Sequence, residues 1–248
     1  MHDVLTIAVA QPASRLGDVV ANAAAHAEAI RRADARLVVL PELSLTGYDH
    51  GLRADAVPDG AWRPLVDACA DAGCVALVGA PVPAPGGGTS IATVAVDPSG
   101  TRVAYRKTWL GADEAGHYVP GDAPAVLTVD GWRVGLGICR DTGIAQHVQD
   151  VAALGIDLYV AGLVHAPEEL AEQDARGRRI AAATGAHVGF ASFAGPTGGG
   201  YAATAGTSTV WSPDGDVLAR AGSGPGDVAV VEIRRPSTQR LPRSAPLP

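Results

Sequence analysis

Aromatic residues are scarce in this sequence, and it contains no long hydrophobic run. Phe, Trp and Tyr make up 4% of the chain, so the core has to be built mainly from Ala, Val, Leu and Ile. Small aliphatic cores of this kind are typical of closely layered α/β proteins. No stretch approaches the roughly 18 to 20 apolar residues of a membrane-spanning helix. The first residues also lack the basic segment and apolar run of a secretory signal, so we expect neither feature.

Cysteine is also scarce, and basic residues are fewer than acidic ones. Three cysteines, an odd and small number, favour a reducing compartment, the cytoplasm, over a disulfide framework. Cys69 and Cys74 have no second cysteine pair or His-x-x-x-His partner, so we interpret both as buried hydrophobic residues and expect no metal site. The formal net charge of −7 disfavours nucleic acid and anionic membranes as partners and leaves a small-molecule substrate open.

The spacing of apolar residues predicts helices mixed with strands. Strands are predicted for residues 6–10, 37–40, 75–79, 91–96, 102–107, 126–129, 133–138, 158–161, 188–192, 207–211, 216–219 and 228–233. Helices are predicted for residues 19–33, with Asp18 as the N-cap, and for 61–72, 145–155 and 167–183. A purely parallel sheet would not need the hairpin turns at 97–100, 130–131 and 212–215, whereas two mixed β-sheets with outer helices would.

The loops and boundaries follow from glycine and proline. Residues 81–88 are predicted to form a loop, and the glycine-rich segment 195–200 is predicted to be mobile. No domain linker is evident, so residues 1–234 are expected to form a single domain. Residues 235–248 are rich in proline and basic residues, which predicts an extended C-terminal tail.

Three residues suited to acyl transfer each stand at the end of a predicted strand. Cys139 ends VGLGI, Glu42 follows LVVLP, and Lys107 ends VAYRK. Active sites of α/β proteins usually lie at the carboxyl ends of strands. A glutamate can deprotonate a thiol, the thiolate can attack a carbonyl carbon, and an ammonium can stabilise the oxyanion that forms. Each residue alone also fits a structural role, as a buried thiol, a loop acid or a solvated lysine; the set points to nucleophilic catalysis.

The segments around these residues resemble the three signatures of the nitrilase superfamily, the carbon–nitrogen hydrolases. PELSLTGY at residues 41–48 resembles the first signature, YRKTWL at 105–110 the second and GICRD at 137–141 the third. They occur in the family's order. The opening IAVAQ at 7–11 and the closing GTSTV at 206–210 are similar to the family's first strand and final hairpin, so the resemblance covers nearly the whole chain.

The resemblance implies a four-layer α-β-β-α sandwich and a cofactor-free mechanism. It implies Glu42 as general base, Lys107 as oxyanion stabiliser and Cys139 as a nucleophile that forms a thioester acyl-enzyme, with the backbone N–H of the next residue as a second oxyanion donor. Members of the family commonly carry a further glutamate beside the lysine. Glu114 fits that place, and its neighbour Asp113 is the alternative. Family members usually pair or assemble further, which implies a homodimer or a higher homo-oligomer.

The sequence departs from the commonest relatives directly after the nucleophile. Arg140-Asp141-Thr142 replaces the usual Tyr-Asp pair and Arg-Phe-Pro-Glu stretch, and the Trp-Glu of many nitrile hydrolysers is absent. We therefore expect a small amide or N-carbamoyl substrate, with a nitrile as the alternative. An inactive binding protein of the same fold and a metallohydrolase are weaker alternatives. The residues expected to contact the substrate are Tyr48, Trp109, Arg140 and His165.

Overall fold

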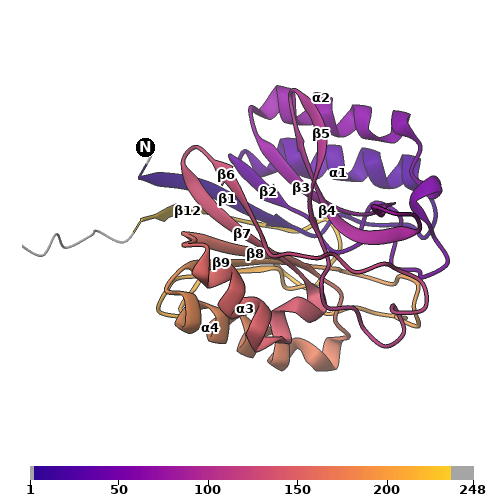
Figure 1. The fold of residues 1–248 in the computed structure, drawn as a ribbon. Helices are drawn as coiled ribbons and strands as arrows, with labels where there is room; N and C mark the ends of the chain where they lie inside the picture. The colour runs from indigo at the N-terminus through magenta and orange to yellow at the C-terminus, as the bar shows by residue number, and fades with distance from the viewer. Residues whose placement is uncertain (1–2, 236–248) are drawn as a thin grey trace, which may run out of the picture.

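The computed structural model describes residues 3–235, and these form two stacked β-sheets covered by helices (Figure 1). Sheet A has the strand order β12-β1-β2-β3-β4-β5, and sheet B has the order β11-β10-β9-β8-β7-β6. The strands of sheet A are β1 (Val4–Ala10), β2 (Leu37–Val39), β3 (Val75–Pro83), β4 (Thr89–Asp97), β5 (Gly100–Arg106) and β12 (Val228–Arg234). The strands of sheet B are β6 (Ala125–Val129), β7 (Trp132–Ile138), β8 (Leu158–Leu163), β9 (His187–Ser192), β10 (Thr209–Trp211) and β11 (Val217–Arg220).

Both sheets are mixed, as the hairpins in the sequence predict. Strands β1, β2 and β3 are parallel to one another, and β7, β8 and β9 are parallel in the other sheet. The remaining pairs are antiparallel. The helices α1 (Val19–Ala33) and α2 (Arg63–Ala72) lie on one outer face, and α3 (Ala145–Ala153) and α4 (Leu170–Thr184) lie on the other (Figure 1). The predicted α-β-β-α sandwich is confirmed.

The alternation of side chains along each strand explains the layers. In β1, Ile7 and Val9 point into the core between the sheets, whereas Ala8 and Ala10 belong to the core cluster on the side of helix α1. Small outward residues allow the helices to approach the sheet closely. Helix α1 begins at the predicted place because the Asp18 carboxylate accepts a hydrogen bond from the N–H of Ala21.

Three boundaries differ from the sequence predictions for identifiable reasons. Strand β3 continues through Pro81 to Pro83, into the predicted loop, because β2 pairs only with its first residues and the missing N–H groups of the prolines remove no bond to β2. Strand β10 begins at Thr209 because Thr207 has a φ of +52°, which extended backbone does not allow. The predicted fourth helix begins as a short 3-10 turn over Pro167–Glu169 before α4.

The two remaining structural expectations concern the membrane and the tail. Among residues 3–235, no helix is long and apolar enough to cross a membrane. The tail predicted for residues 235–248 lies, after its first residue, outside the described residues.

Candidate active site

The three candidate catalytic residues come from both sheets and meet between them. Glu42 follows β2 and Lys107 follows β5 of sheet A, and Cys139 follows β7 of sheet B. Each therefore stands just beyond the carboxyl end of its strand, where a side chain can turn towards the seam between the layers. The structure brings the three side chains together: Lys107 donates to Glu42, and Cys139 lies beside the Glu42 carboxylate.

Two glycines make room for the segment that carries Glu42. A Cβ atom on Gly79 of β3 would lie 2.1 Å from the carbonyl oxygen of Pro41, and one on Gly162 of β8 would lie 2.6 Å from the N–H nitrogen of Glu42. These separations are far below van der Waals contact, so neither position tolerates a side chain without movement of the backbone. Glycines from both sheets thus enclose the Glu42 backbone and fix where its carboxylate emerges.

Lys107 is held between two carboxylates in a buried cluster. Its Nζ donates to Oε1 of Glu42 at 2.7 Å and to Oε1 of Glu114 at 2.7 Å. The side chains of all three residues are at most 3% exposed. An ammonium has three N–H groups, so these two bonds leave one for a substrate oxygen. Buried charges are stable only when they are paired in this way.

Glu114 is fixed by donors from three directions. Besides Lys107, its Oε1 accepts from the hydroxyl of Tyr48 at 3.0 Å, and its Oε2 accepts from the N–H of Gly111 at 2.6 Å. Asp113, the alternative at the sequence level, is exposed and makes no hydrogen bond or ion pair with Lys107. The geometry therefore places Glu114, and not its neighbour, beside the lysine.

Cys139 occupies a sharp turn at the end of β7. Its φ is +40°, a left-handed conformation that costs a non-glycine residue about 1–3 kcal/mol and is typical of functional sites. Its Sγ lies 3.6 Å from the carbonyl oxygen of Val164. The second carboxylate oxygen of Glu42, Oε2, is buried and has no hydrogen-bond partner among residues 3–235. That free acceptor can receive the proton of the thiol.

The electrostatics of the cluster favour a protonated thiol on Cys139 and a basic carboxylate on Glu42. Burial, opposed by Lys107, raises the pKa of Glu42 to about 7. Burial and the nearby charge of Glu42 raise the pKa of Cys139 to about 12. Burial opposes the charged form of Lys107, but Glu42, Cys139 and Glu114 together hold its pKa above its ordinary value. Lys107 therefore stays charged, and Glu42 has a pKa suited to proton transfer near neutral pH.

A cavity of about 270 Å³ opens onto this cluster. Among the residues predicted to contact a substrate, Tyr48, Arg140 and His165 line it. Trp109 does not line it; its side chain borders a neighbouring depression and the residue is 41% exposed. His165 is oriented by Gln173, whose Oε1 lies 3.2 Å from its Nδ1.

The cavity also contains residues that the sequence patterns did not single out. Tyr201, Glu169 and Arg176 all line it. Tyr201 follows the glycine-rich segment 195–200, and this segment contacts Tyr48: the Thr197 hydroxyl accepts from the N–H of Tyr48 at 2.9 Å. An aromatic residue directly after a run of glycines is the signal that could have identified Tyr201.

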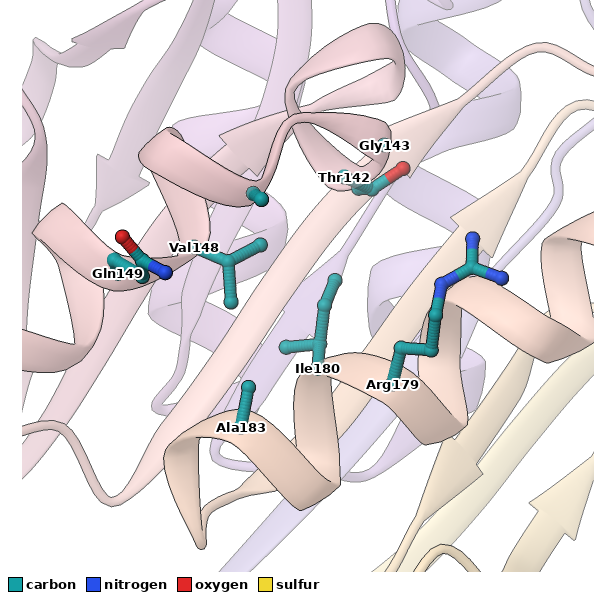
Figure 2. A pocket seen from close by; sticks show the side chains of 8 residues that line it. Thr142, Gly143, Val148, Gln149, Arg179, Ile180 and Ala183 are labelled. Atoms are coloured by element: carbon teal, nitrogen blue, oxygen red, sulfur yellow. The ribbon is translucent and has the colours of Figure 1, made fainter.

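A second hollow lies on the outer side of sheet B and contains none of the catalytic candidates. Figure 2 shows Val148 and Gln149 on the α3 side facing Arg179, Ile180 and Ala183 on the α4 side. Neither a carboxylate nor a cysteine is among the residues that line this hollow. Within the described part of the chain, no cluster of His, Cys, Asp and Glu is arranged to hold a metal ion.

The comparison with protein families agrees with this geometry. The family model described as carbon-nitrogen hydrolase matches residues 6–243. The chain belongs to the carbon–nitrogen hydrolase family. A relative from Pseudomonas protegens, named hydrolase in pqqF 5'region, is 30% identical over 205 residues, which cover 79% of this chain and 71% of the relative. An (R)-stereoselective amidase from a Pseudomonas species is 28% identical over 162 residues, covering 63% of this chain and 59% of the amidase.

Solved structures of an amidase from Nesterenkonia sp. AN1 are similar over almost the whole chain. One, a mutant with the acetamide moiety of fluoroacetamide added covalently at the active-site cysteine, has a TM-score of 0.83 at 28% identity and covers 93% of this chain and 90% of the other. Another, a complex with butyramide, has a TM-score of 0.80 at 28% identity, with coverages of 93% and 91%. This chain is therefore an amidase-like carbon–nitrogen hydrolase.

Proposed function

We propose that this carbon–nitrogen hydrolase cleaves small amides or N-carbamoyl compounds through a thioester on Cys139. The observation that carries the proposal is the buried ammonium of Lys107. Its Nζ lies 2.7 Å from Oε1 of Glu42 and 2.7 Å from Oε1 of Glu114, in the cavity that Cys139 also lines. A structural ion pair would not need a thiol in a left-handed turn beside it. A hydrolase does, because the nucleophile, the base and the oxyanion stabiliser have to converge on one carbonyl group.

The proposed reaction has two halves. Glu42 takes the thiol proton while Sγ of Cys139 attacks the carbonyl carbon. The oxyanion that forms accepts a hydrogen bond from the remaining N–H of Lys107. The C–N bond then breaks, and Glu42 returns its proton to the leaving nitrogen as ammonia or an amine departs. In the second half Glu42 takes a proton from water, the hydroxide oxygen attacks the thioester, and the C–S bond breaks to release the acid and regenerate the thiol.

The size of the cavity supports a small acyl group. A volume of about 270 Å³ lies just below the roughly 300–1,000 Å³ usual for ligand sites, and a mutant of the similar Nesterenkonia amidase is described in complex with butyramide. The sequence alternative, a nitrilase, would use the same thiol and the same lysine. Release of ammonia from an amide but not from the matching nitrile would separate the two.

Arg140 supports a finer proposal, a substrate that carries a carboxylate. Arg140 is exposed and lines the cavity. Its guanidinium makes no hydrogen bond or ion pair with any residue in the range 3–235. We expect Arg140→Ala to raise KM for acidic amides about tenfold or more, in line with a lost charge-assisted hydrogen bond of roughly 1.5–3 kcal/mol, with neutral amides unaffected. An unchanged ratio of kcat/KM between acidic and neutral amides would remove this role.

The decisive test is a panel of small amides, N-carbamoyl compounds and nitriles assayed for ammonia release. Wild type should turn over at least one amide or carbamoyl compound, Cys139→Ala should turn over none, and Cys69→Ala, which changes a buried thiol away from the site, should match wild type. No turnover by wild type would favour the binding-protein alternative. Labelling of Cys139 alone by iodoacetamide would still identify its thiol as the reactive one.

Two further expectations stay predictions. The cysteines at 69, 74 and 139 are free thiols, which supports the cytoplasm as the compartment. Assembly as a homodimer or a higher homo-oligomer is implied by the family and is measured by sedimentation of the purified chain.

A further inference from the structure

One buried carboxylate contacts the backbone on both sides of the site. Asp141, two residues after Cys139, is 0% exposed. Its Oδ2 accepts from the hydroxyl of Tyr105 at 2.8 Å and from the N–H of Ile138 at 2.9 Å. Its Oδ1 accepts from the N–H of Trp109 at 3.0 Å. The hydroxyl of Thr108 also donates to Oδ1, at 3.5 Å. Four donors from two separate segments therefore meet on a single side chain.

These donors flank the catalytic candidates closely. Ile138 immediately precedes Cys139 on sheet B, and Tyr105 and Trp109 stand two residues before and two residues after Lys107. No other carboxylate in the described range of the chain accepts from both the nucleophile turn and the lysine segment. The carboxylate thus links the turn that presents the thiol to the segment that presents the ammonium.

The nucleophile turn needs such support. The left-handed backbone at Cys139 persists only where surrounding bonds hold it. Asp141 accepts from the residue before the cysteine, and the hydroxyl of Thr142 donates to the carbonyl oxygen of Cys139 at 2.6 Å. Both bonds stay within the turn, but Asp141 also accepts from Tyr105 and Trp109 of the lysine segment.

We propose that Asp141 is a positioning residue that sets the separation between the thiol of Cys139 and the ammonium of Lys107. It touches neither thiol nor ammonium and acts through the backbone on either side of them. The thiol attacks the carbonyl carbon while the ammonium stabilises the carbonyl oxygen, and these two atoms are one bond length apart. A shift of either segment therefore weakens both the attack and the stabilisation of the oxyanion. This role rests on the proposed function, since it assumes that thiol and ammonium act on one carbonyl group.

Asp141→Asn tests the role with little change in volume. An amide nitrogen cannot accept a hydrogen bond, so at least one of the four donors loses its acceptor. We expect kcat to fall about 10- to 100-fold, the scale of a 1 Å misplacement at a reacting centre, with KM changed less than about threefold. Tyr105→Phe removes one of the bonds to Asp141, together with the contacts of the same hydroxyl to Thr108, and should lower kcat by a smaller factor. The double variant should be no slower than Asp141→Asn, because both changes break the same link.

The matched control is Asp97→Asn. Its carboxylate also holds a turn, accepting from the N–H of Ser99 and from Arg102, but in the β4–β5 hairpin outside the cavity. We expect its kcat to equal that of wild type. A value of kcat for folded Asp141→Asn within twofold of wild type would overturn the proposal, as would multiplying effects in the double variant. If Asp141→Asn does not fold, Tyr105→Phe decides on the same criterion.

A readout independent of turnover separates this inference from the proposed function. The rate of Cys139 alkylation by iodoacetamide should fall at least about tenfold in Asp141→Asn, because a displaced thiol loses access to Glu42 as its base. An alkylation rate equal to or above that of wild type contradicts the positioning role. If wild type cleaves no compound in the panel, the proposed function fails, and the ratio of alkylation rates still decides the role of Asp141.

Discussion

At the scale of single residues, the proposed mechanism makes the pKa of Glu42 the quantity that sets the pH dependence of the reaction. The carboxyl is buried, and its pKa is raised to about 7. A general base has to be deprotonated, so kcat/KM should rise with pH through a midpoint near 7 and be lost as the pH falls below it. The pKa values of Cys139 and Lys107 are both raised, so no descending limb is expected up to roughly pH 9. A pH profile of kcat/KM measures this, and a midpoint near the ordinary glutamate value would contradict it.

Glu114 makes a second residue-scale prediction. Glu114→Gln keeps an oxygen that can accept from Lys107 but removes the charge that helps to hold the ammonium in place. We expect kcat to fall about 100-fold, a typical loss when an oxyanion-stabilising arrangement is disturbed. Asp113→Asn is the matched control, since it changes the adjacent exposed acid in the same way. Steady-state kinetics should find that control within about twofold of wild type; equal losses in both variants would argue against Glu114.

At the scale of elements, the close approach of strands around Glu42 predicts an effect of Gly162. A Cβ there would lie 2.6 Å from the nitrogen of Glu42, so Gly162→Ala has to move the catalytic backbone. We expect the free energy of unfolding to fall by about 1–3 kcal/mol, as for other overpacked sites, and kcat to fall about tenfold or more. Gly60→Ala, with open space around its Cβ, is the control.

Urea unfolding and kcat measured on both glycine variants check this prediction. Full activity in Gly162→Ala would mean that the Glu42 segment adjusts without cost. A lower free energy of unfolding with an unchanged kcat would mean that the backbone of β8 moves and the backbone at Glu42 does not.

Elements also show what the sequence could predict. Strand ends are visible in a sequence, so Glu42, Lys107 and Cys139 could be predicted as a converging set. The prolines of β3 indicated a loop because a sequence does not show that β2 is too short to reach them. Tyr201 carries a signal in the sequence, an aromatic residue after a run of glycines, but its place in the cavity depends on loop packing. The contacts of the Asp141 carboxylate could not be predicted, because they depend on how the two sheets meet.

At the scale of the whole molecule, the site lies at the seam of two sheets that share one core. Large aliphatic side chains from both sheets, among them Ile7, Val39, Leu136 and Val160, interlock there. The catalytic candidates therefore depend on the stacking of the sheets and not on either sheet alone. The expectation that residues 1–234 form a single domain stays a prediction, and complementation between two fragments of the chain also addresses it.

The strand order has a consequence for dividing the enzyme into two pieces. A cut between residues 123 and 124, in the exposed connection before β6, leaves Glu42, Lys107 and Glu114 on one fragment and Cys139 on the other. The second fragment also carries β12, which pairs with β1 and completes the sheet of the first. We expect each fragment alone to be inert and co-expressed fragments to recover ammonia release by complementation. Turnover by either fragment alone would contradict this expectation. The first fragment lacks strand β12 and Cys139, and the second lacks Glu42, Lys107 and Glu114, so each supplies what the other is missing.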